Sequence, residues 1–211
     1  MKPVVVYVHG LWLTGLEAFL LQRRVEQATG WSWRAFPYLS TMQSMDDSAD
    51  GLHAFIAAQQ APVVHLVGHS LGGLVILRCL ERHPVQPPGR VVFLGTPAMG
   101  SHAAAEFGRL PFGPALLGET AVQELILGGP RRWTHERELG VIAGDQPIAL
   151  ARLVVEFEGA NDGAVSVDET RIPGARAHVV LPVSHTGMLL APRVADEIGA
   201  FLATGAFTAA K

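Results

Sequence analysis

The sequence contains a single cysteine, Cys79, so no disulfide can form within the chain. One free thiol is compatible with a reducing compartment. Charged residues are also scarce, at 17% of 211 residues, and the 16 basic and 19 acidic side chains leave a net charge of −3. Proteins that bind nucleic acids usually carry clustered basic residues, and the basic residues here form no run. We therefore expect no nucleic-acid partner.

Long hydrophobic runs are missing as well. No stretch approaches the roughly 18 consecutive apolar residues that a membrane-spanning helix requires, although the mean hydropathy is +0.27. Residues 1–3 lead directly into an apolar run, which leaves no room for the parts of a signal peptide. We expect a cytoplasmic protein with no integral membrane segment. Because 49% of the residues are hydrophobic, we expect one compact domain over residues 1–211.

Short apolar runs rich in β-branched residues recur along the chain. They lie at residues 4–8, 63–67, 91–94, 141–143 and 178–181, with a weaker run at 33–36. Continuous rather than alternating hydrophobicity is typical of parallel strands that are covered on both faces.

Helical patterns lie between these runs. Leu52, Phe55 and Ile56 are spaced as on one face of a helix, and residues 71–83 are apolar on nearly all sides up to a proline. A third pattern begins at Val194, and the chain end at residues 203–211 is expected to fray. The alternation predicts an α/β fold, with a mainly parallel sheet of about six strands and helices on both faces.

Residues 95–140 interrupt the alternation of strands and helices. The segment is far longer than one crossover helix with its loops requires. The segment is apolar and is repeatedly broken by glycine and proline. We expect short helices that form a small cap or lid inserted after the strand ending near Leu94. The alternative is a loosely structured connection that packs on the edge of the sheet.

The sequence Gly68-His69-Ser70-Leu71-Gly72-Gly73 stands between a predicted strand and the apolar helix. Glycines two positions before and after a serine allow a tight turn that exposes its hydroxyl, and the amino end of the helix faces that hydroxyl. This predicts a nucleophile at Ser70. The alternative is a glycine-rich turn in which Ser70 only caps the helix.

A serine hydroxyl needs a base and an orienting carboxylate to become a nucleophile. His185 is the best base among nine histidines, because it follows the last predicted strand and Pro182. Two acids, Asp145 and Asp162, fit the chain order of serine, acid and histidine, and the residues alone leave the choice open. No metal-binding spacing is present, so we expect no metal and no cofactor.

A third element is His9-Gly10-Leu11-Trp12, directly after the first predicted strand. Acyl transfer requires two backbone amides that face the developing oxyanion. We expect these to be the N–H groups of Leu11 and Leu71. The alternative is a plain turn.

Together these motifs resemble the α/β-hydrolase superfamily, and within it the compact bacterial lipases and esterases. The resemblance extends to Leu94-Gly95-Thr96-Pro97, to Asn161-Asp162-Gly163-Ala164-Val165 and to Val183-Ser184-His185. It implies that Asp162 is the orienting acid, and that the sheet begins at what is the third strand in the superfamily.

The expected function is cleavage of a small-molecule carboxylic ester through an acyl-enzyme on Ser70, with no cofactor. A thioesterase or acyltransferase using the same residues is an alternative, and so is a hydrolase-like protein that only binds a ligand. Apolar side chains near the predicted turns should contact the acyl chain. The candidates are Trp12, Phe107, Phe112, Leu116, Leu117 and Met188.

Overall fold

The computed structural model describes residues 2–147 and 157–208. Their centre is a six-stranded sheet in the order β2-β1-β3-β4-β5-β6, and every pair of neighbouring strands is parallel. The strands are β1 (Val4–Val8), β2 (Ser32–Phe36), β3 (Val64–His69), β4 (Val91–Leu94), β5 (Leu139–Gly144) and β6 (Ala177–Leu181). The predicted α/β class and all six predicted strands are thereby confirmed.

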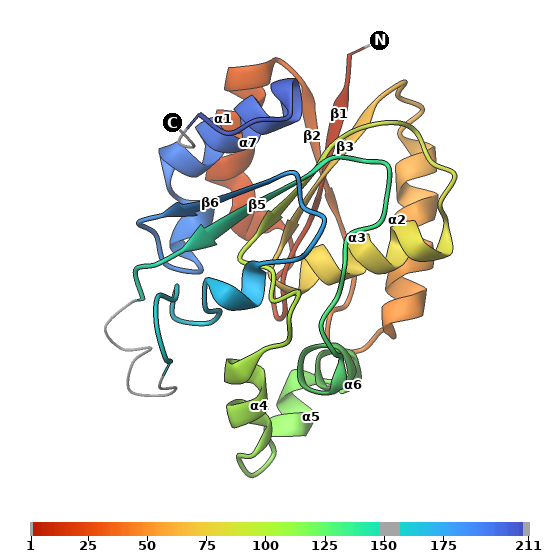
Figure 1. Ribbon diagram of the computed structural model, residues 1–211. Helices are drawn as coiled ribbons and strands as arrows, with labels where there is room; N and C mark the ends of the chain where they lie inside the picture. Colours follow the sequence, from red (N-terminus) through yellow and green to blue (C-terminus); the bar gives the residue numbers. More distant parts are fainter. Residues whose placement is uncertain (1, 148–156, 209–211) are drawn as a thin grey trace.

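Two pairs of helices cover the faces of the sheet (Figure 1). Helices α1 (Phe19–Thr29) and α7 (Pro192–Thr204) lie on one face, and α2 (Met45–Ala58) and α3 (Leu71–Arg82) lie on the other. Neighbouring residues of β1 point to opposite sides: Val6 and Val8 join the core beneath α2 and α3, whereas Val5 and Tyr7 join the core beneath α1 and α7. Burial on both faces explains the continuous hydrophobicity of the strands.

Helix α1 is the one long helix that the sequence patterns do not indicate. Only Leu21 and Val25 of this helix are buried, so its apolar stripe is narrow. It also begins after Ala18 without a side-chain cap, although Gly30 ends it in the left-handed conformation with φ 68°. Within the described residues, no helix is both long and apolar enough to cross a membrane.

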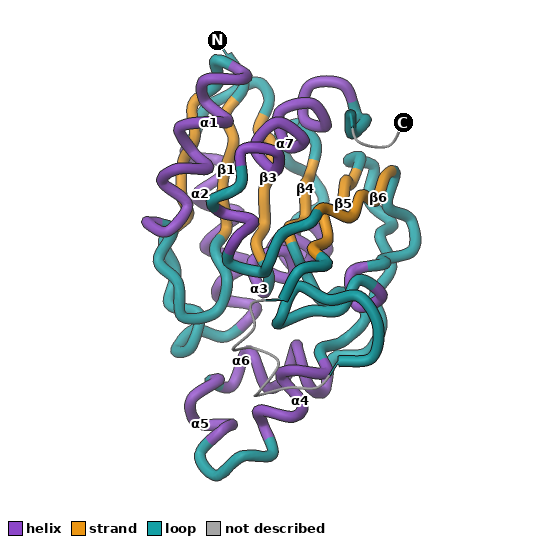
Figure 2. The backbone as a smooth tube through the Cα atoms, turned by 90° about the vertical axis from the view of Figure 1, so that its left-hand side faces the viewer, coloured by secondary structure: helices purple, strands orange, loops and turns teal. Residues whose placement is uncertain are grey.

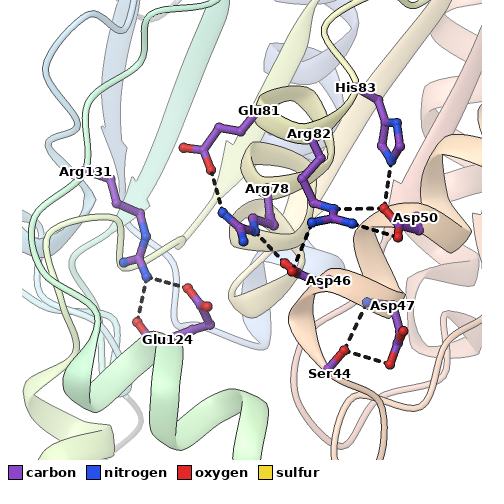
Figure 3. Close-up of polar contacts among 10 residues, drawn as sticks. All are labelled: Ser44, Asp46, Asp47, Asp50, Arg78, Glu81, Arg82, His83, Glu124 and Arg131. Atoms are coloured by element: carbon purple, nitrogen blue, oxygen red, sulfur yellow. Dashed lines mark hydrogen bonds and ion pairs between the residues drawn. The ribbon is translucent and has the colours of Figure 1, made fainter.

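Helices α2 and α3 are joined at their outer edges by ion pairs (Figure 3). Arg78 Nε lies 2.6 Å from Asp46, and Arg82 pairs with both Asp46 and Asp50 at 2.8–3.0 Å. Ser44 caps the amino end of α2 through its hydroxyl. Because exposed pairs contribute little stability individually, we regard them as fixing how α3 lies along α2.

The segment between β4 and β5 contains short helices, which lie beyond the carboxyl ends of the strands (Figures 1 and 2). They are α4 (His102–Gly108), α5 (Gly113–Leu117), α6 (Glu119–Ala121) and the π-helical turn η2 (Val122–Leu127). Leu117, Ala121 and Leu125 are buried in the core that α2 and α3 cover. The segment is therefore anchored to the domain, and its action as a cap stays a prediction.

The carboxyl end of the chain is docked rather than frayed. Thr204 closes α7, Phe207 is buried with its ring 4.9 Å from that of Phe201, and Thr208 donates to the Glu197 carboxylate. The prediction of fraying is therefore wrong for residues 203–208, because a phenylalanine three residues beyond the helix finds a place in the core. Residues 209–211 lie outside the described part of the chain.

Candidate active site

Ser70 stands on a tight turn between β3 and α3. Its backbone has φ 54° and ψ −123°, a conformation that non-glycine residues rarely adopt. A Cβ added at Gly68 would lie 2.6 Å from Gly73 N, and one added at Gly72 would lie 2.1 Å from Val8 O. The two glycines let the chain make this turn against β1, and the turn holds Ser70 in a strained conformation typical of functional sites.

Asp162 and His185 form a hydrogen-bonded pair in which the Asp162 side chain is fully buried and the His185 side chain is partly buried. Asp162 lies in the connection between β5 and β6, and its Oδ2 accepts from His185 Nδ1 at 2.8 Å. Its Oδ1 accepts from the backbone N–H groups of Ala164 and Val165 at 2.9 and 2.8 Å. The His185 N–H also donates to Asp162 O at 2.9 Å. Both the side chain and the main chain of His185 are thus held by one residue.

Asp145, the competing acid, takes no part in this pair. It follows β5 directly, but it is exposed, and its contact in the described structure is a backbone hydrogen bond from its N–H to Leu181 O at 3.2 Å. The geometry therefore brings Asp162, and not Asp145, to His185.

The end of β4 brings this pair close to Ser70. The Ser70 N–H donates to Leu94 O at 2.9 Å. Gly95 follows directly, and a Cβ added there would lie 3.0 Å from both Asp162 Oδ2 and His185 Nδ1. The absence of a side chain at Gly95 thus leaves the space that the pair occupies beside the strand end that binds Ser70. In the sequence Gly95 is marked only by the resemblance, which gives it no role.

Opposing effects act on the protonation of His185. Burial alone lowers the pKa of the imidazole, but the charge of Asp162 and its hydrogen bond outweigh burial, so the pKa lies above its ordinary value of 6.5. The Asp162 carboxylate thus favours the imidazolium form. A base of this kind gains basicity from its partner, which suits it to accept a proton from a neighbouring hydroxyl.

The turn after β1 lies against Ser70. A Cβ added at Gly10 would lie 3.1 Å from Ser70 Cβ. The Leu11 N–H has no hydrogen-bond partner among the described residues, and the Leu71 N–H belongs to the first turn of α3, where no acceptor exists within the helix. Both N–H groups therefore have no acceptor in their own elements, and the turn that carries Leu11 lies against Ser70; their role as an oxyanion hole stays a prediction.

Residues of the loop that follows β2 form hydrogen bonds with this turn. Tyr38 Oη donates to His9 O at 2.8 Å, and the Trp12 N–H donates to Ser40 Oγ at 3.1 Å. Trp12 itself has φ 60°. A bulky residue in this conformation is uncommon, so its backbone is constrained by these contacts.

Three of the six predicted substrate contacts meet at the edge of the site. The Trp12 indole N–H donates to Leu116 O at 2.9 Å, and the Trp12 ring meets that of Phe107 edge-on with centroids 6.0 Å apart. Trp12 is nevertheless 58% exposed. Trp12, in the turn after β1, therefore contacts residues of helices α4 and α5.

The other three candidates lie elsewhere. Phe112 is 81% exposed. Leu117 is buried in the core beneath α2 and α3, and Met188 in the core beneath α1 and α7. A Cβ added at Gly144 would lie 2.9 Å from both Met188 Cε and Asp162 Cβ, so Met188 packs beneath the acid.

A cavity of about 510 Å³ opens beside the turn after β1. Its lining comes from residues 12–14 and 37–41 and from Gln43. No apolar run or motif marks the part of the lining that follows β2, so the sequence does not predict it. The contact between the two segments exists only in the folded chain.

A histidine outside the site serves a local contact. His178 in β6 lies 2.8 Å from Thr170 Oγ1 through its Nε2. Over residues 2–147 and 157–208, no group of three or more His, Cys, Asp or Glu side chains is arranged to hold a metal ion.

Comparison with solved structures identifies the architecture as the α/β-hydrolase fold. The mature lipase BlEst2 of Bacillus licheniformis superposes with a TM-score of 0.74 at 24% identity, over 96% of this chain and 91% of that chain. The carboxylesterase CesB of Bacillus subtilis gives 0.61 at 14% identity, over 98% and 85%. The RedJ thioesterase of Streptomyces coelicolor gives 0.61 at 14%, over 94% and 85%.

Sequence comparisons add no assignment. No family model matches the chain, and no curated protein matches it. The likeness to the solved structures therefore establishes the fold alone.

Proposed function

We propose that this chain is a serine hydrolase that cleaves small-molecule carboxylic esters. One observation carries the proposal: the Asp162–His185 pair, joined at 2.8 Å, lies against the strand end that binds the strained turn of Ser70. A strained serine, a carboxylate and a histidine in this order along the chain serve acyl transfer in many hydrolases.

In the proposed reaction Ser70 Oγ attacks the ester carbonyl while His185 Nε2 takes the hydroxyl proton. Asp162 fixes the imidazole tautomer and stabilises the imidazolium. The N–H groups of Leu11 and Leu71 donate to the oxyanion. His185 then gives the proton to the leaving alcohol, and water, activated by the same histidine, hydrolyses the acyl-enzyme on Ser70.

The names of the structural neighbours support a hydrolase of this kind, since they include a lipase, a carboxylesterase and a thioesterase. Esters and thioesters use the same nucleophile and oxyanion donors, so the thioesterase and acyltransferase alternatives share this site. Matched esters and thioesters with one acyl chain, assayed with and without an added acceptor alcohol, separate the three activities. A protein that only binds its ligand would give no turnover in any of them.

Covalent labelling by a fluorophosphonate probe tests the mechanism. The wild-type protein should be labelled at Ser70, and Ser70→Ala should not be labelled. The variant should lose about 10⁴-fold or more in kcat for a p-nitrophenyl ester, because the nucleophile is absent. Circular dichroism confirms that the variant is folded. Substantial ester turnover by a folded Ser70→Ala protein would contradict the mechanism.

A further inference from the structure

We propose that His69, the last residue of β3, is a positioning residue that holds His185 against Asp162. This inference rests on the proposed serine mechanism. His69 directly precedes the nucleophile, and its side chain is buried at 1% exposure. It does not touch the reacting atoms in the proposed reaction, and its effect would pass through His185.

Hydrogen bonding fixes the orientation of the His69 ring. Its Nε2 lies 3.1 Å from the backbone carbonyl oxygen of His185. A carbonyl oxygen only accepts, so Nε2 carries the proton and donates it. The two imidazole rings also pack together, with centroids 4.7 Å apart and planes tilted by 42°.

His185 is consequently held at three points by two residues. Its N–H donates to Asp162 O, its Nδ1 donates to Asp162 Oδ2, and its carbonyl oxygen accepts from His69. The first two contacts come from the connection that carries Asp162, and the third comes from the strand that carries Ser70. The His69 contact is therefore the direct hydrogen bond from the strand of the nucleophile to the residue of the base.

The other ring nitrogen of His69 faces the turn after β1, which carries Gly10. A Cβ added at Gly10 would lie 3.2 Å from His69 Nδ1. This nitrogen is buried and has no hydrogen-bond partner in the described part of the chain. His69 thus lies between the turn after β1 and His185, and it contacts both.

A positioning imidazole in this place must remain uncharged, because an imidazolium would repel the charged form of His185. Burial, and then repulsion from His185, lowers the pKa of His69 to about 3. The other titratable groups around the ring are Asp162, whose charge acts against this shift, and His9, whose charge adds to it. His69 is therefore a neutral donor throughout the range in which His185 titrates.

Two variants of similar shape isolate the hydrogen bond. Gln and Met are both unbranched, but at position 69 only Gln offers an N–H donor. We expect His69→Met to lower kcat about 10- to 100-fold with KM little changed, because His185 is displaced from its productive position. His69→Gln should retain most of the wild-type kcat. His178→Phe, which alters a histidine whose described hydrogen bond is with Thr170, serves as the control.

Two further measurements separate positioning from a general structural effect. In His69→Met the pH midpoint of kcat/KM should fall, since a loosened His185 gains less from the Asp162 charge. The low-field proton resonance of the His185–Asp162 hydrogen bond should broaden or shift upfield in His69→Met and persist in His69→Gln. If His69→Met does not fold, His69→Phe takes its place.

Equal kcat, pH midpoint and low-field resonance in wild type and His69→Met would overturn the inference. A Gln variant as impaired as the Met variant would also overturn it, because the donor would then not matter. Failure of the fluorophosphonate probe to label wild-type Ser70 would instead reject the proposed function. The resonance comparison does not depend on turnover, so the two failures are distinguishable.

Discussion

Asp162 is held by hydrogen bonds at both of its carboxylate oxygens. One carboxylate oxygen accepts two backbone N–H groups and the other binds His185 Nδ1. Charge-assisted hydrogen bonds of this kind are stronger than neutral ones. The carboxylate is therefore oriented before any substrate binds, and its remaining bond is directed at the imidazole.

Replacing this acid should be far more harmful than replacing its sequence rival. We expect Asp162→Asn to lower kcat about 10³- to 10⁴-fold, because His185 loses the partner that fixes its tautomer and stabilises its charged form. Asp145→Asn should change kcat little, since Asp145 is exposed. Steady-state kinetics on one ester measure both, and the reverse ranking would transfer the role to Asp145.

The charge state of His185 should control the acid limb of activity. A general base must be neutral, and a raised pKa means that protonation already competes above pH 6.5, its ordinary value. We expect kcat/KM to fall as the pH decreases through a midpoint above 6.5. His69 should add no second step in this range, because its pKa is about 3. A profile that is flat down to pH 4 would exclude a histidine base.

Two segments are candidates for binding the acyl chain of the proposed substrate. The sequence predicts that the segment after β4 supplies the acyl wall, and Phe107 and the Leu116 carbonyl do meet Trp12. The cavity of about 510 Å³, however, is lined by the segments after β1 and β2.

A series of p-nitrophenyl esters of increasing chain length distinguishes the two elements. We expect Leu39→Trp, which fills the cavity, to lower kcat/KM for the longest accepted ester about tenfold and to spare the shortest. Phe112→Ala is the control, because Phe112 is 81% exposed. A changed preference in Leu116→Ala, with none in Leu39→Trp, would place the acyl wall on the segment after β4.

A short segment beyond α7 packs against the core. Phe207 is 5% exposed and packs on Phe201, and a Cβ at Gly140 of β5 would lie 2.7 Å from the Phe207 ring. Glu197, fully buried, accepts from both the N–H and the hydroxyl of Thr208 and pairs with Arg193. This segment completes the core on the α1 and α7 face.

Loss of that aromatic ring should weaken the whole domain. We expect Phe207→Ala to lower the free energy of unfolding by about 3 kcal/mol, because it leaves a cavity under the sheet. Phe112→Ala removes an equal side chain from an exposed position and should cost less than about 0.5 kcal/mol. Urea denaturation measures both. Equal stability of the two variants would mean that the end of the chain does not contribute to the core.

The sequence alone predicts a structural feature when the surroundings of its residues follow from their neighbours in the chain. The strands were found because burial on both faces makes them continuously apolar. The turn at Ser70 was found because only closely spaced glycines permit it. Helix α1 was missed because two buried side chains, Leu21 and Val25, leave too narrow a stripe to distinguish it.

The sequence by itself determined the strands, the parallel α/β class, the serine turn and the candidate base. The tertiary structure decided which acid meets His185, since Asp145 and Asp162 occupy equally permitted places in the chain order. It also decided that Met188 and Leu117 belong to the core, and that residues 37–41 line a cavity with residues 12–14. These outcomes depend on contacts between segments far apart in the chain, and such contacts form only when the sheet assembles.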